Sequence, residues 1–211
     1  MQVKVIGGVL LAALAATADE MPRMETFLGY TYVRANSAGT LPPFSTNGGS
    51  GQFGYNFNKW LGAVADAGAV HSGDIGGAPI DNTTLNFLFG PRVSLRYPRL
   101  RPYFQVLWGA AYLAASSEAP AILAGSAPAI IGVREPLVPG QPISARLLAS
   151  QTAFALTAGG GLDIRLNKYV SLRPLAVEYY LTRFRNFRAQ NDNGQNNVRY
   201  TTGFNFTLGA Q

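Results

Sequence analysis

The chain has 211 residues, no cysteine, 24 glycines, 13% charged residues and a formal net charge of +6. This length suits one domain with a sizeable core or one closed barrel, and the composition is that of neither a disordered chain nor a coiled coil. The absence of cysteine excludes disulfides, thiolate metal sites and cysteine nucleophiles. The arginines are scattered along the chain rather than gathered beside aromatic residues, so we expect no nucleic-acid partner.

The first residues predict an export signal. Met1 to Lys4 form a short basic start, Val5 to Leu14 form an apolar run, and Ala16 to Ala18 match the A-x-A cleavage pattern. We therefore expect residues 1–18 to be a signal peptide and residues 19–211 to be a single exported domain. The apolar run is shorter than the ~20 residues that a helix needs to span a bilayer.

Eight segments after this signal alternate apolar and polar side chains with a period of two, which predicts strands. They cover residues 25–36, 51–57, 60–71, 83–96, 101–115, 151–166, 169–185 and 197–208. Tight turns are expected at residues 58–59, 97–100 and 167–168, and long loops at residues 37–50, 72–82, 116–150 and 187–196. Because turns and loops alternate strictly, all tight turns lie at one end of the sheet and all long loops at the other.

Two prolines fall inside these segments. Pro91 has no N–H to donate to a neighbouring strand, so we expect a bulge there. Around Pro174 the apolar parity shifts, which places Leu175 and Val177 on the outer face and Glu178 on the inner face.

The pattern predicts an all-β fold, an eight-stranded antiparallel transmembrane β-barrel with short periplasmic turns and long extracellular loops. Trp60, Tyr97 and Tyr169 lie near strand ends, as aromatic residues do at the membrane interfaces. Parity alone does not distinguish the inside of a barrel from the outside. A soluble lipocalin-like carrier, with an apolar interior and a polar exterior, therefore remains an alternative.

Four short phrases resemble bacterial outer-membrane β-barrel proteins of the outer-membrane protein A-like type. They are F-L-G-Y-T-Y-V-R-A-N at residues 27–36, F-G-P-R-V-S-L-R at 89–96, G-G-G-L-D-I at 159–164 and S-L-R-P at 171–174. The resemblance implies a location in the cell outer membrane of a Gram-negative bacterium, in contact with membrane lipid and lipopolysaccharide. It implies architecture rather than activity.

The end of the chain is similar to the signal by which the barrel-assembly machinery recognises its clients. Thr201, Gly203, Phe206 and Leu208 carry this similarity, which implies assembly by that machinery. The usual terminal aromatic residue is absent, because the chain continues through residues 209–211.

The interior of an eight-stranded barrel is just wide enough to be filled by side chains. Charged residues of both signs fall on the expected inner parity, namely Asp66, Arg92, Arg96, Asp163, Glu178 and Arg199. Because buried charges need partners, we predict a lumen ion-pair network with Glu178 and Arg92 as its main members, and with Arg96 and Asp163 nearer the periplasmic rim. Two alternatives are a solvated polar set that only stabilises the barrel and a gated path for small ions.

No catalytic or metal-binding arrangement is apparent in the sequence. His71 is the only histidine, and the adjacent Ser72 would point to the opposite face of a strand, which opposes a catalytic pair. Asp66, Asp74 and Asp81 are not spaced as in a calcium loop. We expect no enzymatic activity, no metal and no cofactor.

The segment 116–150 is the main candidate for an interaction surface. It is unusually apolar for a loop, with Ile130, Ile131 and Leu137 flanking Arg134. It could bind an extracellular protein partner, lipopolysaccharide acyl chains or a neighbouring barrel, or it could fold over the barrel mouth or extend the flanking strands beyond the membrane. We therefore predict a structural or surface-interaction role such as adhesion, with a narrow low-conductance pore as the alternative.

Overall fold

The structure, a computed structural model, describes residues 23–36, 43–74, 80–122, 142–184 and 194–208. Side-chain surroundings are described in these ranges except at residues 117–122 and 142–148. The predicted signal peptide, residues 1–18, lies outside the described residues, and so do Ile130, Ile131, Arg134 and Leu137.

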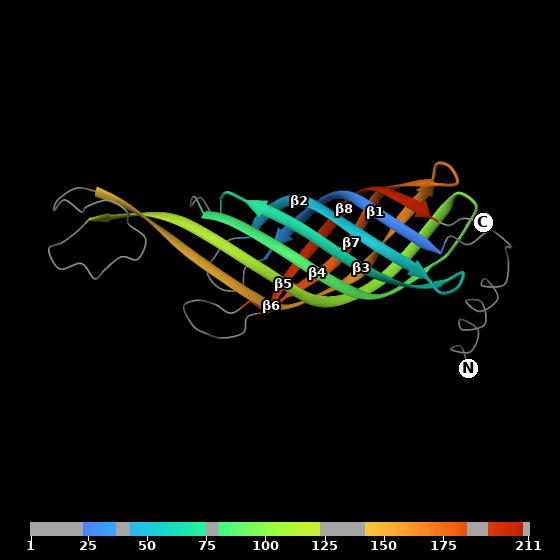
Figure 1. Cartoon of the computed structure of the whole chain (residues 1–211), viewed down its shortest axis with the longest axis horizontal. Coiled ribbons are helices and arrows are strands. Elements are labelled where there is room, and N and C mark those ends of the chain that lie inside the picture. The colour runs from blue at the N-terminus through green and yellow to red at the C-terminus, as the bar shows by residue number, and fades with distance from the viewer. Residues whose placement is uncertain (1–22, 37–42, 75–79, 123–141, 185–193, 209–211) are drawn as a thin grey trace, which may run out of the picture.

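The described residues form eight antiparallel strands that close into a barrel (Figure 1). The strands are β1 (Met24–Ala35), β2 (Phe44–Asn56), β3 (Leu61–Ser72), β4 (Ile80–Ser94), β5 (Leu100–Ile122), β6 (Pro142–Arg165), β7 (Val170–Thr182) and β8 (Gln195–Leu208). Each strand pairs with its sequence neighbours, and β8 pairs with β1 from Met24↔Leu208 to Arg34↔Val198, which seals the sheet. The predicted fold class is therefore confirmed.

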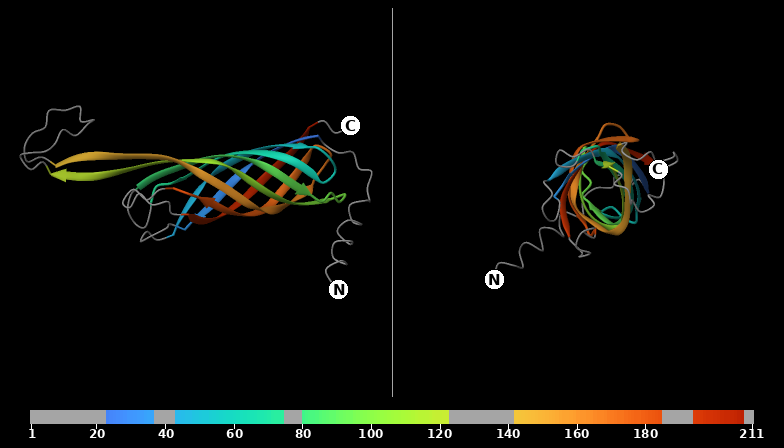
Figure 2. Two further views of the ribbon diagram at one scale, coloured as in Figure 1. Left: turned by 90° about the horizontal axis from the view of Figure 1, so that it is seen from below. Right: turned by 90° about the vertical axis from the view of Figure 1, so that its left-hand side faces the viewer.

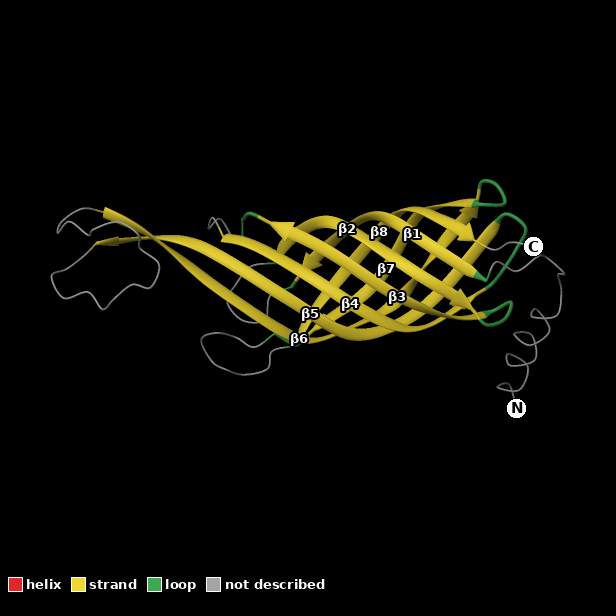
Figure 3. Cartoon of the chain, in the orientation of Figure 1, coloured by secondary structure: helices red, strands yellow, loops and turns green. Residues whose placement is uncertain are grey.

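All regular structure in the described ranges is strand (Figure 3). Within those ranges, no helix has the length and apolar character that a membrane crossing would require.

The two faces of the wall differ in chemistry. Large apolar side chains point outward, with Leu28, Phe87 and Phe104 exposing 57%, 62% and 55% of their surface. Charged side chains point inward, with Glu178 and Arg199 each 1% exposed. This is the reverse of the arrangement that a soluble lipocalin-like carrier needs, so that alternative is wrong; the outer face suits lipid and the inner face suits a polar lumen.

Residues 44–50 were predicted as part of a loop but belong to β2, whose first residue Phe44 pairs with Ala35. The sequence Phe44 to Ser50 contains serine, threonine, asparagine and glycine and has no apolar alternation. Its strand conformation comes from the ladders to β1 on one side and β3 on the other.

The described parts of the segment 116–150, residues 116–122 and 142–150, are strand rather than loop. β5 and β6 pair from Leu100↔Ile164 out to Ile122↔Pro142, whereas β4 accompanies β5 only as far as Ser117. Figure 2 shows this hairpin, in yellow-green and gold, reaching well beyond the other strands. The alternative in which the flanking strands extend outward is the one that the structure confirms.

The irregularities of the sheet lie elsewhere than at Pro91. β4 keeps one register with β3 through Ala63↔Pro91, and its register with β5 is the same before and after that residue, so the expected bulge is wrong. The register shifts instead between Leu162 and Ile164 on β6 and between Arg173 and Ala176 on β7. The latter shift contains Pro174, in agreement with the change of parity in the sequence.

Candidate functional site

Asp66 of β3 lies at the centre of the lumen and accepts hydrogen bonds from three side chains. Gln52 Nε2 donates at 2.8 Å and Asn86 Nδ2 at 2.6 Å. Arg199 donates from Nη1 and Nη2 at 3.0 and 3.1 Å, one bond to each carboxylate oxygen. Both oxygens of this buried carboxylate are therefore satisfied, as a buried charge requires.

Arg199 also contacts a second carboxylate, that of Glu178 on β7. Its Nε donates to Glu178 Oε2 at 2.6 Å, and Gln105 Nε2 donates to Glu178 Oε1 at 2.5 Å. Gln105 Oε1 in turn accepts from Arg92 Nε and Nη2 at 2.9 and 2.7 Å.

These bonds close on themselves, because Arg92 Nη2 donates to Gln52 Oε1 at 2.5 Å and Gln52 donates to Asp66. We call this closed circuit the lumen ring. Its members are Gln52, Asp66, Arg92, Gln105, Glu178 and Arg199, which come from β2, β3, β4, β5, β7 and β8. The circuit therefore links strands on all sides of the barrel across its interior.

A second set of contacts leads from the lumen ring towards the short turns. Arg173 donates to Gln52 Oε1 at 2.9 Å and makes a two-bond contact with Asp163 at 2.7 and 3.1 Å. Asn205 Nδ2 lies 3.2 Å from both Asp163 Oδ2 and Glu25 Oε2. At the rim, the Glu25 carboxylate forms salt bridges with Arg96 at 3.4 Å and with Arg101 at 3.8 Å.

Aromatic rings and glycines complete this half of the lumen. The Arg173 guanidinium lies 4.1 Å from the Phe27 ring centroid and 4.5 Å from that of Tyr103, and Arg92 lies 4.6 Å from the Tyr103 ring centroid. A Cβ atom at Gly161 would come within 2.8 Å of the Tyr103 hydroxyl, so this glycine leaves room for the stack.

The described lumen holds one more cation than anion. The guanidinium groups are those of Arg92, Arg96, Arg101, Arg173 and Arg199, and the carboxylates are those of Glu25, Asp66, Asp163 and Glu178. Burial lowers the pKa of Arg96, which lies in the turn after β4, and the adjacent Glu25 carboxylate opposes this. Arginine stays protonated in proteins, so the surplus is positive and lies on the side of the short turns, where two arginines share Glu25.

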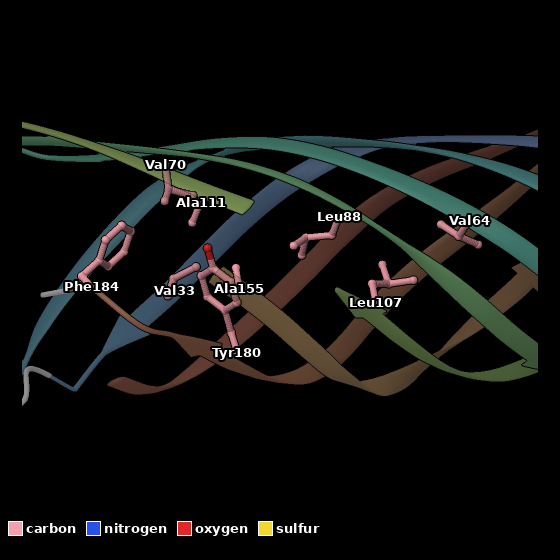
Figure 4. Close-up of a cluster of buried hydrophobic side chains, with 9 residues drawn as sticks. All are labelled: Val33, Val64, Val70, Leu88, Leu107, Ala111, Ala155, Tyr180 and Phe184. Atoms are coloured by element: carbon pink, nitrogen blue, oxygen red, sulfur yellow. The ribbon is translucent and has the colours of Figure 1, made fainter. Parts of the chain in front are cut away.

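A cluster of buried apolar side chains also lies in the lumen (Figure 4). Most of its members lie further from the short turns than the lumen ring does: Val70 follows Asp66, Ala111 follows Gln105, and Tyr180 follows Glu178. The cluster comprises Val33, Val64, Val70, Leu88, Leu107, Ala111, Ala155, Tyr180 and Phe184. Ion pairs are thus concentrated in the periplasmic half of the barrel, whereas the outer half combines this cluster with buried neutral polar side chains such as Thr46, Asn82 and Asn197.

The six residues proposed from the sequence do not all contact one another. Asp66, Arg199 and Glu178 meet directly, whereas Arg92 reaches Glu178 only through Gln105. Asp163 and Arg96 lie on the periplasmic side of the ring, each with a partner that the prediction did not name, Arg173 and Glu25 respectively.

Sequence reasoning missed four residues that complete these contacts, namely Gln52, Gln105, Arg173 and Glu25. The two glutamines lie on the inner parity, so their inward direction could be predicted. They were missed because the prediction considered only charged residues as partners. Arg173 precedes Pro174, where the parity shifts, and this hid its inward direction.

The residues of the expected assembly signal divide between the two faces of β8. Thr201 is 2% exposed inside the barrel, whereas Phe206 and Leu208 are 39% and 53% exposed on the outside. Gly203 lies against β1, where a Cβ atom would come within 2.5 Å of Gly29 Cα.

His71 and Ser72 take separate partners at the outer end of β3. His71 Nδ1 lies 3.1 Å from Thr83 Oγ1, and the Ser72 hydroxyl donates to the Asp74 carbonyl at 2.8 Å. Among the described residues, no group of three or more histidine or acidic side chains is placed to hold a metal ion.

Within the described residues, the outer part of β6 has no partner strand on its β7 side. Arg183 N donates to Phe154 O at 3.0 Å, and pairing with β7 begins there and continues inward from Ala155. Phe154 therefore directs its backbone groups towards the β7 side, and by alternation so do Ser144, Arg146, Leu148, Ser150 and Thr152. No strand in the described part of the chain pairs with that side of residues 142–153.

Comparison with known proteins gives a family match and structural neighbours. A family model described as outer membrane protein beta-barrel domain matches residues 5–211. No curated protein matches the chain.

Among solved structures, Neisserial surface protein A is 14% identical, with a TM-score of 0.59 over 88% of this chain and 97% of that chain. The attachment invasion locus protein of Yersinia pestis is also 14% identical, with a TM-score of 0.53 over 88% of this chain and 99% of that chain. The same Yersinia pestis protein in complex with the heparin analogue sucrose octasulfate is 17% identical, with a TM-score of 0.51 over 88% and 100%. At these identities the similarity shows the fold.

Proposed function

Because the chain belongs to the family of outer membrane protein beta-barrel domains, we propose that it is a non-conducting barrel of the outer membrane whose β5–β6 hairpin docks an extracellular protein. One observation carries this proposal: the outer part of β6 extends beyond β7 and offers a row of backbone N–H and C=O groups.

An unpaired strand edge is a template for another strand. A partner segment in extended conformation can add to such an edge, with main-chain hydrogen bonds supplying affinity and side chains supplying specificity. The inner half of the hairpin is held by β4 and β7 within the barrel wall, so the edge is presented on a rigid support. One of the structural neighbours is named for attachment and invasion, which is compatible with docking at the cell surface.

The lumen supports a non-conducting barrel rather than a narrow pore. The lumen ring joins side chains from six strands across the interior, and the apolar cluster follows it on the outer side. An ion would have to separate buried charge pairs and then pass the apolar cluster, and hydrophobic constrictions block ion passage by excluding water.

The docking proposal is tested by proline at Ser150. S150P removes an N–H that points to the free edge and leaves the hydrogen bonds to β5 in place, since Ser150 directs its backbone away from β5. S150A is the matched control, because alanine keeps that N–H. Bacteria that display each variant are tested for binding to the immobilised proteins fibronectin, laminin and collagen.

We expect wild type and S150A to bind at least one of these probes and S150P to lose that binding, with equal amounts of folded barrel in the membrane. Equal binding by S150P and S150A would contradict docking at the edge. Binding to none of the three proteins by wild type would remove the support for an adhesive role.

We also propose that the barrel-assembly machinery recognises β8 through its outward side chains. Phe206 and Leu208 are accessible on the outer face, whereas Thr201 points into the lumen and Gly203 lies against β1. F206Q/L208Q should lower the yield of folded protein in cells while leaving refolding into detergent micelles intact. An unchanged yield in cells would contradict this role.

A further inference from the structure

Two of the three short turns have the same local structure. In the first, Asn58 Oδ1 accepts from the backbone N–H groups of Trp60 and Leu61 at 2.9 and 2.7 Å. In the last, Asn167 Oδ1 accepts from Tyr169 and Val170 at 2.8 and 2.9 Å. The asparagine fixes each turn, so that the lysine and the aromatic residue that follow it occupy equivalent positions.

Every short turn combines an exposed cation with an exposed aromatic residue. The pairs are Lys59 with Trp60, Arg99 with Tyr97, and Lys168 with Tyr169. Lys168 Nζ lies 4.9 Å from the Tyr169 ring centroid. An aromatic residue next to a long basic side chain is the combination that lies at the boundary between acyl chains and headgroups.

Among the described residues, the exposed charge at this end of the barrel has one sign. Arg23, Lys59, Arg99 and Lys168 are exposed there, whereas the carboxylates of that end in the described chain, Glu25 and Asp163, are buried in lumen pairs. The opposite end is mixed in charge. It exposes Arg34, Asp74, Asp81 and Arg183 in the described residues.

An apolar band lies directly next to these cations on the outer wall. Phe57, Leu166 and Leu208 expose 60%, 56% and 53% of their surface at the same end of the strands. A ligand that covers both features needs an apolar chain and an anionic head. Phospholipid of the periplasmic leaflet has this chemistry, whereas a soluble acidic protein would leave the apolar band uncovered.

We propose that the three short turns form a binding surface for anionic phospholipids, with Lys59, Arg99 and Lys168 contacting the headgroup phosphates and Trp60, Tyr97 and Tyr169 lying against the upper acyl chains. This surface is independent of the outer hairpin. It selects lipids by charge on the periplasmic side and fixes the depth of the barrel in the membrane.

The two tryptophans of the chain give a local measurement. Trp60 lies in the first turn, and Trp108 lies on the outer face of β5, 39% exposed. W108F leaves Trp60 as the reporter of the rim, and W60F leaves Trp108 as the reporter of the wall. Each variant is refolded into bilayers of phosphatidylglycerol and phosphatidylcholine, in which one lipid at a time carries brominated acyl chains that quench tryptophan fluorescence.

We expect the quenching of Trp60 to report a preference for phosphatidylglycerol of about fivefold, the gain for one lysine or arginine near an anionic headgroup, and Trp108 to report about equal affinities. The preference at Trp60 should fall towards unity in 1 M salt, where charges are screened within about 3 Å. In the W108F background, K59Q/R99Q/K168Q removes the three charges and should abolish the preference for phosphatidylglycerol. K59R/K168R keeps the charges and should retain the preference. R34Q/R183Q, at the opposite end, is the matched control and should leave it unchanged.

If Trp60 and Trp108 reported the same preference for phosphatidylglycerol over phosphatidylcholine, the proposal would be overturned. A surface that binds an acidic protein instead of lipid would give that result. Retention of the preference in K59Q/R99Q/K168Q would also overturn it. If that variant does not fold, the salt dependence at Trp60 in the W108F protein decides, because a preference that persists in 1 M salt is not one of charge.

Discussion

Arg199 binds two carboxylates at once, those of Asp66 and Glu178, with a side chain that is 1% exposed. Replacing it with methionine would leave two carboxylates buried without their cation. Removing one partner of a buried ion pair typically costs about 3 to 5 kcal/mol. We therefore expect R199M to lower the free energy of unfolding by about that amount, measured by urea unfolding in lipid vesicles.

The matched control for this change is R34M. Arg34 is exposed near the outer end of β1 and donates one hydrogen bond, to Ser45 Oγ. Exposed substitutions of this kind usually change stability by less than about 0.5 kcal/mol. If R199M and R34M had equal effects, the lumen ring would contribute nothing measurable to stability.

Two inward glycines differ in the space around them. A Cβ atom at Gly159 would lie 2.3 Å from the Val177 carbonyl oxygen and 2.5 Å from Glu178 Cα, both backbone atoms of β7, whereas one at Gly54 would meet its nearest neighbour at 3.7 Å. We expect G159A to lower the free energy of unfolding by about 1 to 3 kcal/mol through overpacking, and G54A to be tolerated. Unfolding of both variants in lipid vesicles tests this, and a tolerated G159A would show that the backbone of β7 can move away without loss of stability.

At the residue scale, sequence parity indicates which side chains enter the lumen but not which ones meet. Arg92 and Glu178 both point inward, yet Gln105 separates them and bonds to each. Partner choice depends on the stagger between strands, which brings together residues as distant in sequence as Gln52 and Arg173. The period of two contains no information about that stagger.

At the element scale, the β5–β6 hairpin divides into a part inside the barrel wall and a part beyond it. The lumen contacts of these strands come from Arg101, Gln105 and Asp163, all well below the point where β4 and β7 end. We expect replacement of residues 119–145 by an Asn-Gly turn to leave the free energy of unfolding within about 1 kcal/mol of wild type, because surface changes away from packed contacts rarely cost more.

Urea unfolding in lipid vesicles measures the change in the free energy of unfolding. In parallel, faster migration on an SDS gel without boiling shows whether the shortened chain still forms a compact barrel. A loss of several kcal/mol would mean that the outer hairpin helps to hold the barrel together. That result would favour a structural role for it over docking.

The positions of the strands could be predicted where each has a lipid face, and less well where it does not. β4 and β8 show strict alternation, and their lipid-facing residues, such as Phe87 and Phe204, lie where the parity places them. The first residues of β2 and the outer parts of β5 and β6 carry no such alternation. Their conformation is set by pairing with a neighbouring strand, and a single segment does not reveal that pairing.

At the scale of the whole molecule, two barriers lie in series along the barrel axis, the lumen ring and the apolar cluster. We expect the wild-type protein to give no stepwise conductance in planar bilayers. The variant Y180A/F184A removes two large side chains from the apolar cluster. It should also give no stepwise conductance, because the lumen ring remains. Resolved openings of the wild-type protein would favour the narrow pore instead.

The contacts of β8 have a consequence for the order of folding. β8 is the last of the eight strands in the chain, and it supplies Arg199 to Asp66 and Glu178 and Asn205 to Glu25 and Asp163. Until it joins β1, the acidic side chains of the earlier strands lack these donors. A barrel with an open seam therefore holds Asp66 and Glu178 without their cation in a partly dehydrated interior, and closure of the seam is favoured as one concerted event rather than as a gradual one.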